Sequence, residues 1–525
     1  MIDASTPHSE SEQSALDRVL VNGMAWTAVM RWTAQVISWI ATAVAARILT
    51  PADYGLVGMA MLGIGLVRMV EDFGLDAVLV QDRGISGIRQ ARLAGLVILA
   101  GGVFFGAFVL LSGPIAGFFK EPKVAALVTV LGILFISDAV QVVPRAVLQR
   151  EMEFRKLAGL QFVQVVATQS VLVCGALLGW GVWSLVFNSL GGALVTTALL
   201  VYWRPFAVQW PRGLADLSRP LTQGWRILAA RFTWYVYTSA DQTVIGRVLG
   251  KDALGTYSFA MTFSTMISQE ISMVVGRVVP GVFSSVQTRP EELRRYFLLL
   301  TELLCYLVMP VSVGIALTSD LVVAIVLGPQ WGGVVAPLRI LCVYAAFYSS
   351  QVLLGHLLLW TGRFRANMWC NVLAAVVLPV AFFVGTRWGL EGVAWAWVIA
   401  FPLVNLPNFI IAFRIIAING WTWLGVLMPS LAACALMTVL VLLVRGLLPA
   451  STGVPIEMTA SILAGVLTYI GVLYVFYRAR VKRMIDFLRL IRGASGSPDG
   501  GGGPGSRPDT PDSDCRADLQ TTAQS

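Results

Sequence analysis

Polar side chains recur at helical spacing in two apolar stretches of the chain. The first set lies at steps of four, three and four residues, which places it on one face of a helix. Its members are Arg31, Gln35, Ser38 and Thr42. A second set follows 200 residues later at the equivalent positions, Arg231, Tyr235, Thr238 and Gln242. Guanidinium groups match phosphate oxygens, so we predict that the two faces bind an anionic ligand. The alternative is that these side chains only hydrate a cavity.

Further ionisable residues lie within apolar stretches. Arg68, Arg226 and Arg277 extend the set of candidate ligand-binding residues. Three carboxylates are candidates for ion coupling, namely Asp72, Asp241 and Glu270. Arg68 and Asp72 are four residues apart and could instead pair with each other. We expect no metal site, no cofactor and no catalytic residue, because the six cysteines and two histidines are scattered and no phosphate-binding P-loop motif is present.

The composition identifies the elements that must position these residues. The mean hydropathy is +0.75, and 13% of residues are charged where a soluble domain has about 25%. Apolar stretches of about 20 residues, the length of a bilayer-spanning helix, recur between Met24 and Tyr477. We therefore predict an all-α integral membrane protein with about fourteen transmembrane helices. Their expected ranges are 24–46, 54–80, 91–113, 124–147, 158–179, 182–203, 224–249, 255–283, 297–318, 333–360, 367–386, 392–413, 421–445 and 456–477.

The two halves of the chain repeat each other. "ARILTPADYG", from Ala46, is echoed without a gap by "GRVLGKDALG", from Gly246, and "GVWSLVF", from Gly181, is echoed by "GVAWAWV", from Gly392. Six expected spans separate equivalent points, so the repeats share one orientation. We predict two parallel-repeat six-helix bundles around a central cleft, followed by a C-terminal helical hairpin. An inert duplicated bundle is the alternative.

The same pattern predicts the domain organisation. The expected segments are a cytoplasmic N-terminal tail (1–20), an N-lobe (21–213), a C-lobe (214–420), the hairpin (421–478), an amphipathic interfacial helix (479–493) and a disordered cytoplasmic tail (494–525). Residues 479–493 mix basic and apolar residues in a pattern typical of an amphipathic helix. A frayed continuation of the last span is the alternative for it.

Basic residues predict the orientation in the membrane. One set of connecting segments carries 22 Lys and Arg residues and the opposite set carries seven. The positive-inside rule then places both termini in the cytoplasm. This topology, with attraction to anionic lipid, accounts for the positive net charge, so we expect no nucleic-acid partner.

Three segments carry a resemblance to a known family. "ARILTPADYG", "EDFGLDAVLVQD" (Glu71 to Asp82) and "DQTVIGRVLGKDALGTYSFA" (Asp241 to Ala260) resemble the polysaccharide-transport family, and above all the Wzx-type oligosaccharide flippases or lipopolysaccharide biosynthesis proteins. That family belongs to the multidrug/oligosaccharidyl-lipid/polysaccharide exporter superfamily. The resemblance covers residues 16–480.

The resemblance implies an activity. It implies a flippase that moves an undecaprenyl-pyrophosphate-linked oligosaccharide across the bacterial inner membrane for lipopolysaccharide or exopolysaccharide synthesis. It also implies that cationic cavity residues hold the pyrophosphate, which agrees with the placement of Arg31 and Arg231. Membrane lipid, a polysaccharide polymerase and a chain-length regulator are the expected partners.

Two other functions remain open. A drug/cation antiporter of the same superfamily would need an acidic or neutral cleft, whereas the predicted cleft contains arginines. A membrane glycosyltransferase or polymerase would need catalytic residues in a long external loop, and the sequence has no such loop. Both are therefore less favoured than a flippase.

Overall fold

The computed structural model describes residues 29–71, 87–151, 153–210, 218–286, 289–449, 451–484 and 486. Every regular element within these ranges is a helix, which confirms the predicted all-α class. The first half contains an N-terminal helix, Val29–Ile48, followed by α2 (Pro51–Glu71), α4 (Gly87–Phe119), α5 (Lys123–Leu131), α6 (Ile133–Arg150), α7 (Phe154–Leu177) and α8 (Val182–Trp203).

The second half begins with a helix that is equivalent to the N-terminal one. Its long helices are α9 (Ser218–Val248), α10 (Lys251–Val286), α11 (Pro290–Leu317), α13 (Val335–Ser349), α14 (Val352–Trp360), α15 (Phe364–Gly385) and α16 (Gly389–Ile415). Short elements join some of them, namely α12 (Ser319–Val322), η2 (Val323–Leu327), η3 (Pro329–Val334) and η4 (Thr386–Trp388). The hairpin consists of α17 (Gly420–Leu447) and α18 (Val454–Phe476).

The helices have the length and surface of membrane-spanning segments. Each of the fourteen predicted spans overlaps one of these helices or a broken pair of them. Within the described residues, nine segments are long and apolar enough to cross a membrane, or ten if a bent pair at the start of the chain is one span. The number fourteen therefore stays a prediction. Outward-facing apolar side chains such as Val376 and Leu467 are 64% and 70% exposed, as lipid-facing residues would be.

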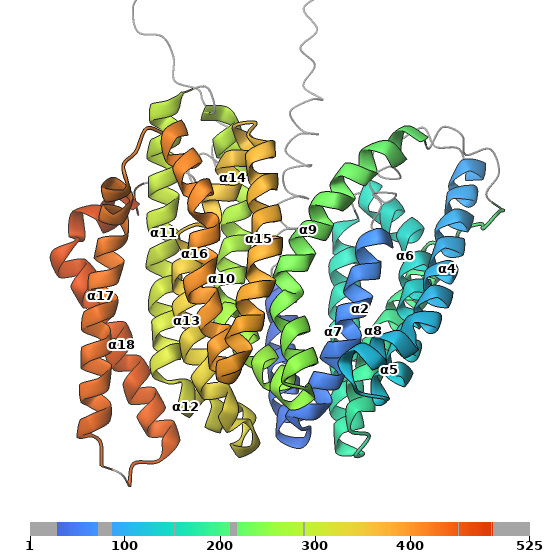
Figure 1. The fold of residues 1–525 in the computed structure, drawn as a ribbon, viewed down its shortest axis with the longest axis horizontal. Coiled ribbons are helices and arrows are strands. Elements are labelled where there is room, and N and C mark those ends of the chain that lie inside the picture. The colour runs from blue at the N-terminus through green and yellow to red at the C-terminus, as the bar shows by residue number, and fades with distance from the viewer. Residues whose placement is uncertain are drawn as a thin grey trace, which may run out of the picture.

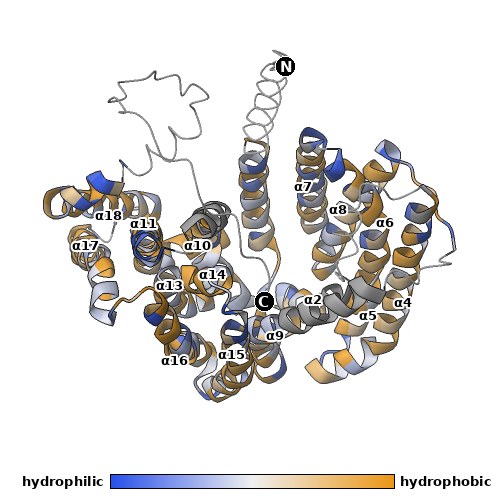
Figure 2. Cartoon of the chain, turned by 90° about the horizontal axis from the view of Figure 1, so that it is seen from above, coloured by the Kyte–Doolittle hydropathy of each residue, from blue (hydrophilic) through white to orange (hydrophobic). Residues whose placement is uncertain are grey.

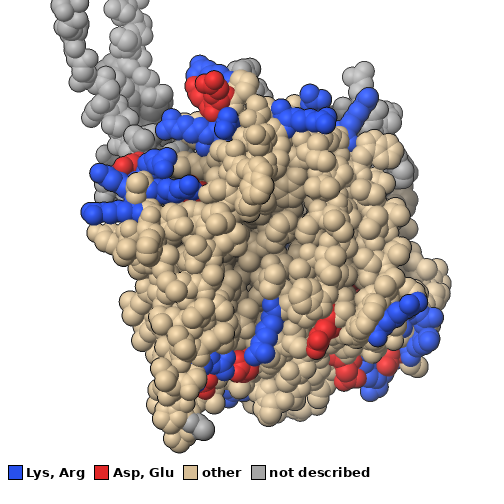
Figure 3. Space-filling model, turned by 60° about the vertical axis from the view of Figure 1, so that its left-hand side comes forward, with Lys and Arg blue, Asp and Glu red and all other residues tan. Residues whose placement is uncertain are grey.

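The helices form two groups that meet at one end. Figure 1 shows α2 to α8 in one group and α10 to α18 in the other, and the groups converge at the lower end and diverge toward the upper end. Seen from above, apolar residues lie around the outer faces of both groups (Figure 2). Lys and Arg side chains gather at the upper end in Figure 3, as expected if that end faces the cytoplasm. The orientation itself stays a prediction.

The repeated sequence forms a sharp corner in each half. In the first half, the N-terminal helix and Pro51–Gly65 are bent by 120° relative to each other. Thr50 and Asp53 form a reciprocal cap at this corner: the Thr50 backbone nitrogen and hydroxyl donate to Asp53 Oδ2 at 3.0 and 2.8 Å. The second corner has Gly250 in place of the threonine, in a left-handed conformation with φ of 89°. The two corners thus occupy equivalent sequence positions but differ in their local backbone and capping.

The two corners pack directly against each other where α2 crosses α10. A Cβ added to Gly55 would lie 1.8 Å from the carbonyl oxygen of Lys251. A Cβ added to Gly255 would lie 1.9 Å from the carbonyl oxygen of Pro51. The contact is reciprocal, and only glycine permits it on either side because the obstructing atoms belong to the backbone. Small residues allow such close approach of helices in membranes.

The hairpin is held to the second half at both ends. Deep between the helices, Ser430 donates to the carbonyl oxygen of Cys305 and Tyr469 donates to that of Tyr306, both at 3.1 Å. Near the opposite end of α17, Arg445 pairs with Asp320 at 2.5 Å and with Glu457 at 2.9 Å. A bend at Tyr477 separates α18 from the helical residues 478–484 that follow it. Most of the predicted interfacial helix and the whole of 494–525 lie outside the described residues.

We expect Gly55→Ala and Gly255→Ala each to destabilise the protein by about 1–3 kcal/mol, because the added methyl group meets backbone atoms that cannot move independently. Thermal unfolding of the purified protein in detergent should show a lowered midpoint. Gly106→Ala in α4 is the matched control, since a Cβ there meets nothing within 4 Å and alanine favours a helix. Midpoints equal to that of the control would contradict the close crossing.

Candidate functional site

The polar face predicted on the N-terminal helix points into the protein. Arg31, Gln35, Ser38 and Thr42 are all half-buried. Away from this face, Trp32 and Ile40 are 58% and 61% exposed. This sorting agrees with the cost of placing an arginine in lipid, which is several kcal/mol on insertion scales. The helix therefore presents its polar residues inward and its apolar residues outward.

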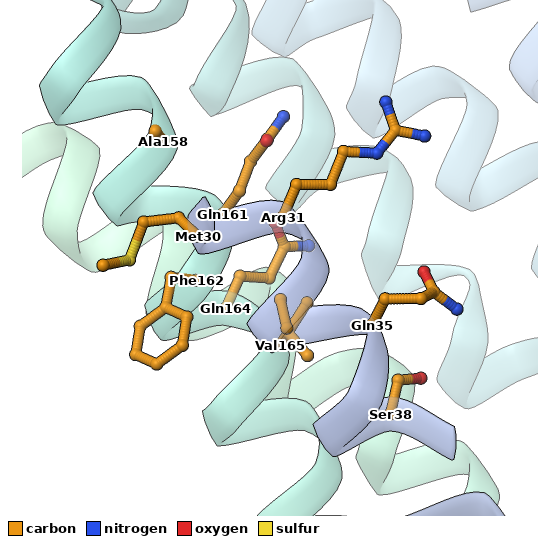
Figure 4. Close-up of a pocket in the computed structure, with 10 residues that line it drawn as sticks. Met30, Arg31, Gln35, Ser38, Ala158, Gln161, Phe162, Gln164 and Val165 are labelled. Carbon is orange, nitrogen blue, oxygen red and sulfur yellow. The ribbon is translucent and has the colours of Figure 1, made fainter. Parts of the chain in front are cut away.

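A cavity of about 280 Å³ lies between the N-terminal helix and α7. Five residues of each helix line it: Met30, Arg31, Ala34, Gln35 and Ser38 from the first, and Ala158, Gln161, Phe162, Gln164 and Val165 from the second. Figure 4 shows Arg31, Gln35 and Ser38 extending to one side of the N-terminal helix, and Met30 and Phe162 extending to the other. The cavity thus has a polar side and an apolar side.

Hydrogen bonds hold part of the cavity wall in place. Gln169 of α7 donates from Nε2 to the Ser38 hydroxyl at 3.0 Å, which ties α7 to the N-terminal helix. Gln35, Gln161 and Gln164 make no hydrogen bond through their side chains to other described residues. Three of the four predicted residues on this helix therefore line one cavity. The two glutamines of α7 were not among the predicted residues.

The equivalent face in the second half lies on α9. The side chain of Arg231 is outside the described side chains, so its direction stays a prediction. Tyr235 is half-buried and donates from its hydroxyl to the carbonyl oxygen of Leu62 in α2 at 2.7 Å. Gly65 leaves room for that ring, since a Cβ there would lie 2.3 Å from the hydroxyl oxygen. Tyr235 thus links α9 to α2 across the two halves of the chain.

Thr238 and Gln242 complete this second face. Both are half-buried. The Thr238 hydroxyl donates to the carbonyl oxygen of Trp234 at 2.8 Å, so its proton is used within α9. The ligand-binding role of this face stays a prediction.

Asp241 is the most enclosed of the predicted carboxylates. Its exposed fraction is 0%, and Oδ2 accepts hydrogen bonds from the Tyr257 hydroxyl at 2.9 Å and from Trp397 Nε1 at 3.0 Å. Oδ1 accepts from the backbone nitrogen of Gln242 at 2.7 Å. Within the described residues no Lys or Arg pairs with it. A carboxylate surrounded by neutral donors is poised to change its charge at lower cost than one fixed by a cation.

The other predicted residues can be placed only by their helices. Arg68 belongs to α2, Arg226 to α9, and Glu270 and Arg277 to α10, but their side chains are not described. Asp72 lies outside the described residues, so the alternative pairing of Arg68 with Asp72 stays open. Among the described residues no group of three or more His, Cys, Asp or Glu side chains could hold a metal ion.

Contacts between the halves close the lower end of the molecule. Trp331 of η3 is fully buried, packs on Phe259 with ring centroids 4.3 Å apart and on Tyr54 at 5.5 Å, and donates from Nε1 to the carbonyl oxygen of Ala46 at 2.7 Å. Tyr54 and Ala46 belong to the first half, and Phe259 and Trp331 belong to the second.

Polar contacts surround this aromatic cluster. Lys251 of α10 pairs with Glu121, which lies between α4 and α5, at 2.9 Å. The Arg47 guanidinium donates to the carbonyl oxygen of Ile325, and Gln330 donates to that of Ala46 at 2.9 Å. Each contact joins one half to the other. The equivalence of the two corners was predicted from the sequence, but these pairs were not.

Comparison with known proteins agrees with this architecture. Residues 44–336 match the family described as polysaccharide biosynthesis protein. The lipopolysaccharide biosynthesis protein WzxC of Escherichia coli (strain K12) is 26% identical over 405 residues, which cover 75% of this chain and 80% of WzxC. The succinoglycan biosynthesis transport protein ExoT of Rhizobium meliloti (strain 1021) is 23% identical over 485 residues, which cover 90% of this chain and 96% of ExoT.

Solved structures show the same fold. The lipid II flippase MurJ, in an inward closed conformation, superposes with a TM-score of 0.70 at 12% identity, over 87% of this chain and 99% of MurJ. An inward-facing multidrug resistance transporter of the MATE family gives a TM-score of 0.59 at 14% identity, over 73% of this chain and 94% of that transporter. The fold is therefore that of multi-pass membrane transporters, which confirms the predicted class.

We expect Trp331→Ala to loosen the closed end, because it removes a fully buried side chain, a hydrogen bond and two ring contacts between the halves. Loss of a buried tryptophan costs about 3–5 kcal/mol. The measurement is the rate at which a maleimide labels Ala46→Cys in a background without native cysteines. Trp388→Ala is the control, since that side chain is 68% exposed. Equal labelling rates in both variants would show that Trp331 does not hold this end closed.

Proposed function

The chain belongs to the polysaccharide biosynthesis protein family, and we propose that it moves a polyprenyl-pyrophosphate-linked oligosaccharide repeat unit across the bacterial inner membrane. The observation that carries this proposal is the inward polar face of Arg31, Gln35 and Ser38 on a cavity within a transporter fold. Relatives named for lipopolysaccharide biosynthesis and succinoglycan transport support a glycan substrate. The product would serve lipopolysaccharide or exopolysaccharide synthesis.

The arginines would bind the pyrophosphate. Arg31 lines the cavity, and Arg231 occupies the equivalent position of the second half. A guanidinium binds phosphate oxygens through two parallel hydrogen bonds and keeps its charge in a half-wet site. Arg68, Arg226 and Arg277 would add positive charge on α2, α9 and α10. Amide and hydroxyl groups on the two polar faces would bind the sugars.

Transport would proceed by alternating access between two matched halves. The aromatic cluster and the Lys251–Glu121 pair would act as the gate at the closed end, and substrate would enter from the basic end. We propose that this basic end and both termini are cytoplasmic, in keeping with the positive-inside rule. In this proposal the two halves that move are the N-lobe, residues 21–213, and the C-lobe, residues 214–420. A polysaccharide polymerase and a chain-length regulator are the partners that would take up the product.

A drug/cation antiporter is the second candidate, because the MATE transporter shares the fold. The inward arginine on the cavity favours an anion over a cation. A membrane glycosyltransferase or polymerase is less favoured still. The two solved structures that share this fold, MurJ and the MATE transporter, are named as a flippase and a transporter.

Asp241, with Asp72 and Glu270, is proposed to couple transport to an ion. Asp241 joins α9 to α10 through Tyr257 and to α16 through Trp397. Binding of a proton would remove the negative charge that both donors stabilise. The packing of three helices would then depend on the protonation of one side chain, which is how a buried carboxylate biases a conformational equilibrium.

The first test is a double substitution, Arg31→Ala with Arg231→Ala, in a strain whose own copy is deleted. We expect surface polysaccharide to fall at least about tenfold at unchanged protein level, because each lost phosphate contact is worth about 1.5–3 kcal/mol. Arg387→Ala is the control, since Arg387 is exposed in η4. Export at the wild-type level by the double variant would exclude an anion-binding role for this pair.

The second test separates coupling from folding at Asp241. Asp241→Asn keeps the volume and mimics the neutral acid, so it should lose most transport. Its oxygen can still accept from Tyr257 and Trp397, but its amide nitrogen would face the backbone N–H of Gln242, so a loss of stability of about 1–3 kcal/mol should accompany the change. Asp241→Ala should also lose stability, by about 1–3 kcal/mol for each donor left unpaired. Asp252→Asn, at an exposed carboxylate of α10, is the control. Full transport by Asp241→Asn would rule out coupling through this residue.

A further inference from the structure

Two glutamines of α7 lie on the cavity with unused hydrogen-bonding groups. Gln161 and Gln164 are three residues apart, and both line the cavity, as does Gln35 of the N-terminal helix. None of the three makes a side-chain hydrogen bond to another described residue. Each primary amide offers two donors and one acceptor oxygen. The cavity wall therefore holds three amides available to a ligand.

The arrangement of these amides is directional. In Figure 4, Gln161 extends toward the same side as Arg31, and Gln164 lies beneath Arg31 between the two helices. Met30 and Phe162 extend to the opposite side. A ligand held by the amides would thus have Arg31 beside its polar end and apolar side chains beyond it.

We propose that Gln161 and Gln164, together with Gln35, form a subsite for the sugar that is bonded to the pyrophosphate of the transported lipid. The proposal rests on the proposed function and deepens it, because it divides the cavity between a phosphate position at Arg31 and a sugar position on α7. α7 would then select the glycan, while the arginine would recognise any lipid pyrophosphate.

The chemistry of the wall favours a neutral, hydroxyl-rich group. A sugar hydroxyl is both donor and acceptor, as an amide is, so the two can pair in either direction. The cavity of about 280 Å³ is at the small end of ligand sites, which suits a sugar unit rather than a long chain. Apart from Arg31, no lining residue is charged. The wall therefore matches a sugar better than a second anion or a metal ion.

The position of the subsite is held by a separate contact. Gln169, on the same helix, donates to Ser38 at 3.0 Å and so fixes α7 against the N-terminal helix. Gln169 is a positioning residue in this proposal and does not touch the sugar. The two glutamines of the subsite can be changed without breaking that bond.

The experiment compares two probes on the purified protein in nanodiscs: undecaprenyl pyrophosphate and undecaprenyl-pyrophosphate-linked glucose. We expect the wild-type protein to bind the glucose-bearing lipid more tightly. Gln161→Met with Gln164→Met should weaken binding of that lipid about tenfold and leave binding of the bare lipid unchanged, because two hydrogen bonds are lost without a change in charge. Arg31→Ala should weaken both. Val163→Ala, on the exposed outer face of α7, should change neither.

The outcomes distinguish the subsite from the proposed function. Equal loss for both lipids in the double glutamine variant, or no loss for either, would overturn the subsite. Wild-type protein that binds both lipids equally would also overturn it while leaving a lipid-pyrophosphate transporter intact. Wild-type protein that binds neither would overturn the proposed function and the subsite with it.

Discussion

The reciprocal contact of Gly55 and Gly255 is the constraint on which the arrangement of the two halves depends. Each glycine lies against a backbone carbonyl of the opposite corner, so no side chain separates the α2 and α10 backbones at this crossing. The closeness brings Tyr54, Phe259 and Trp331 into ring contact and brings Lys251 within 2.9 Å of Glu121. With one end joined in this way, the two groups of helices diverge toward the opposite end (Figure 1).

The lipid solvent explains why the polar faces point where they do. Arg31 would be costly against acyl chains, and the exposed Trp32 and Ile40 would lose little there. A helix with these two faces has one favourable rotation, which turns its arginine inward. The cavity against α7 is the result. The equivalent sequence positions recur on α9, where Tyr235 donates to the carbonyl oxygen of Leu62 in α2.

Much of this architecture could be predicted from sequence, because apolar length and helical spacing are local properties. The helices, the corners and the inward face of Gln35 and Ser38 follow from them. Contacts such as Trp331 with Ala46 join residues 285 positions apart, and no local pattern encodes them. Gln161 and Gln164 were not predicted, because two amides three residues apart are a weaker sequence pattern than the four-residue polar face that includes Arg31. The inward direction of Arg231 stays a prediction.

The docking of α17 and α18 has a mechanical consequence. Ser430, Tyr469 and Arg445 fasten the hairpin to α11 and α12, and both of these helices belong to the second half. If the two halves rotate about the crossing at Gly55 and Gly255, the hairpin must move together with the second half. The two moving parts then differ in mass and in the surface that moves through lipid. Bilayer thickness and viscosity would consequently act on one side of the pivot more than on the other.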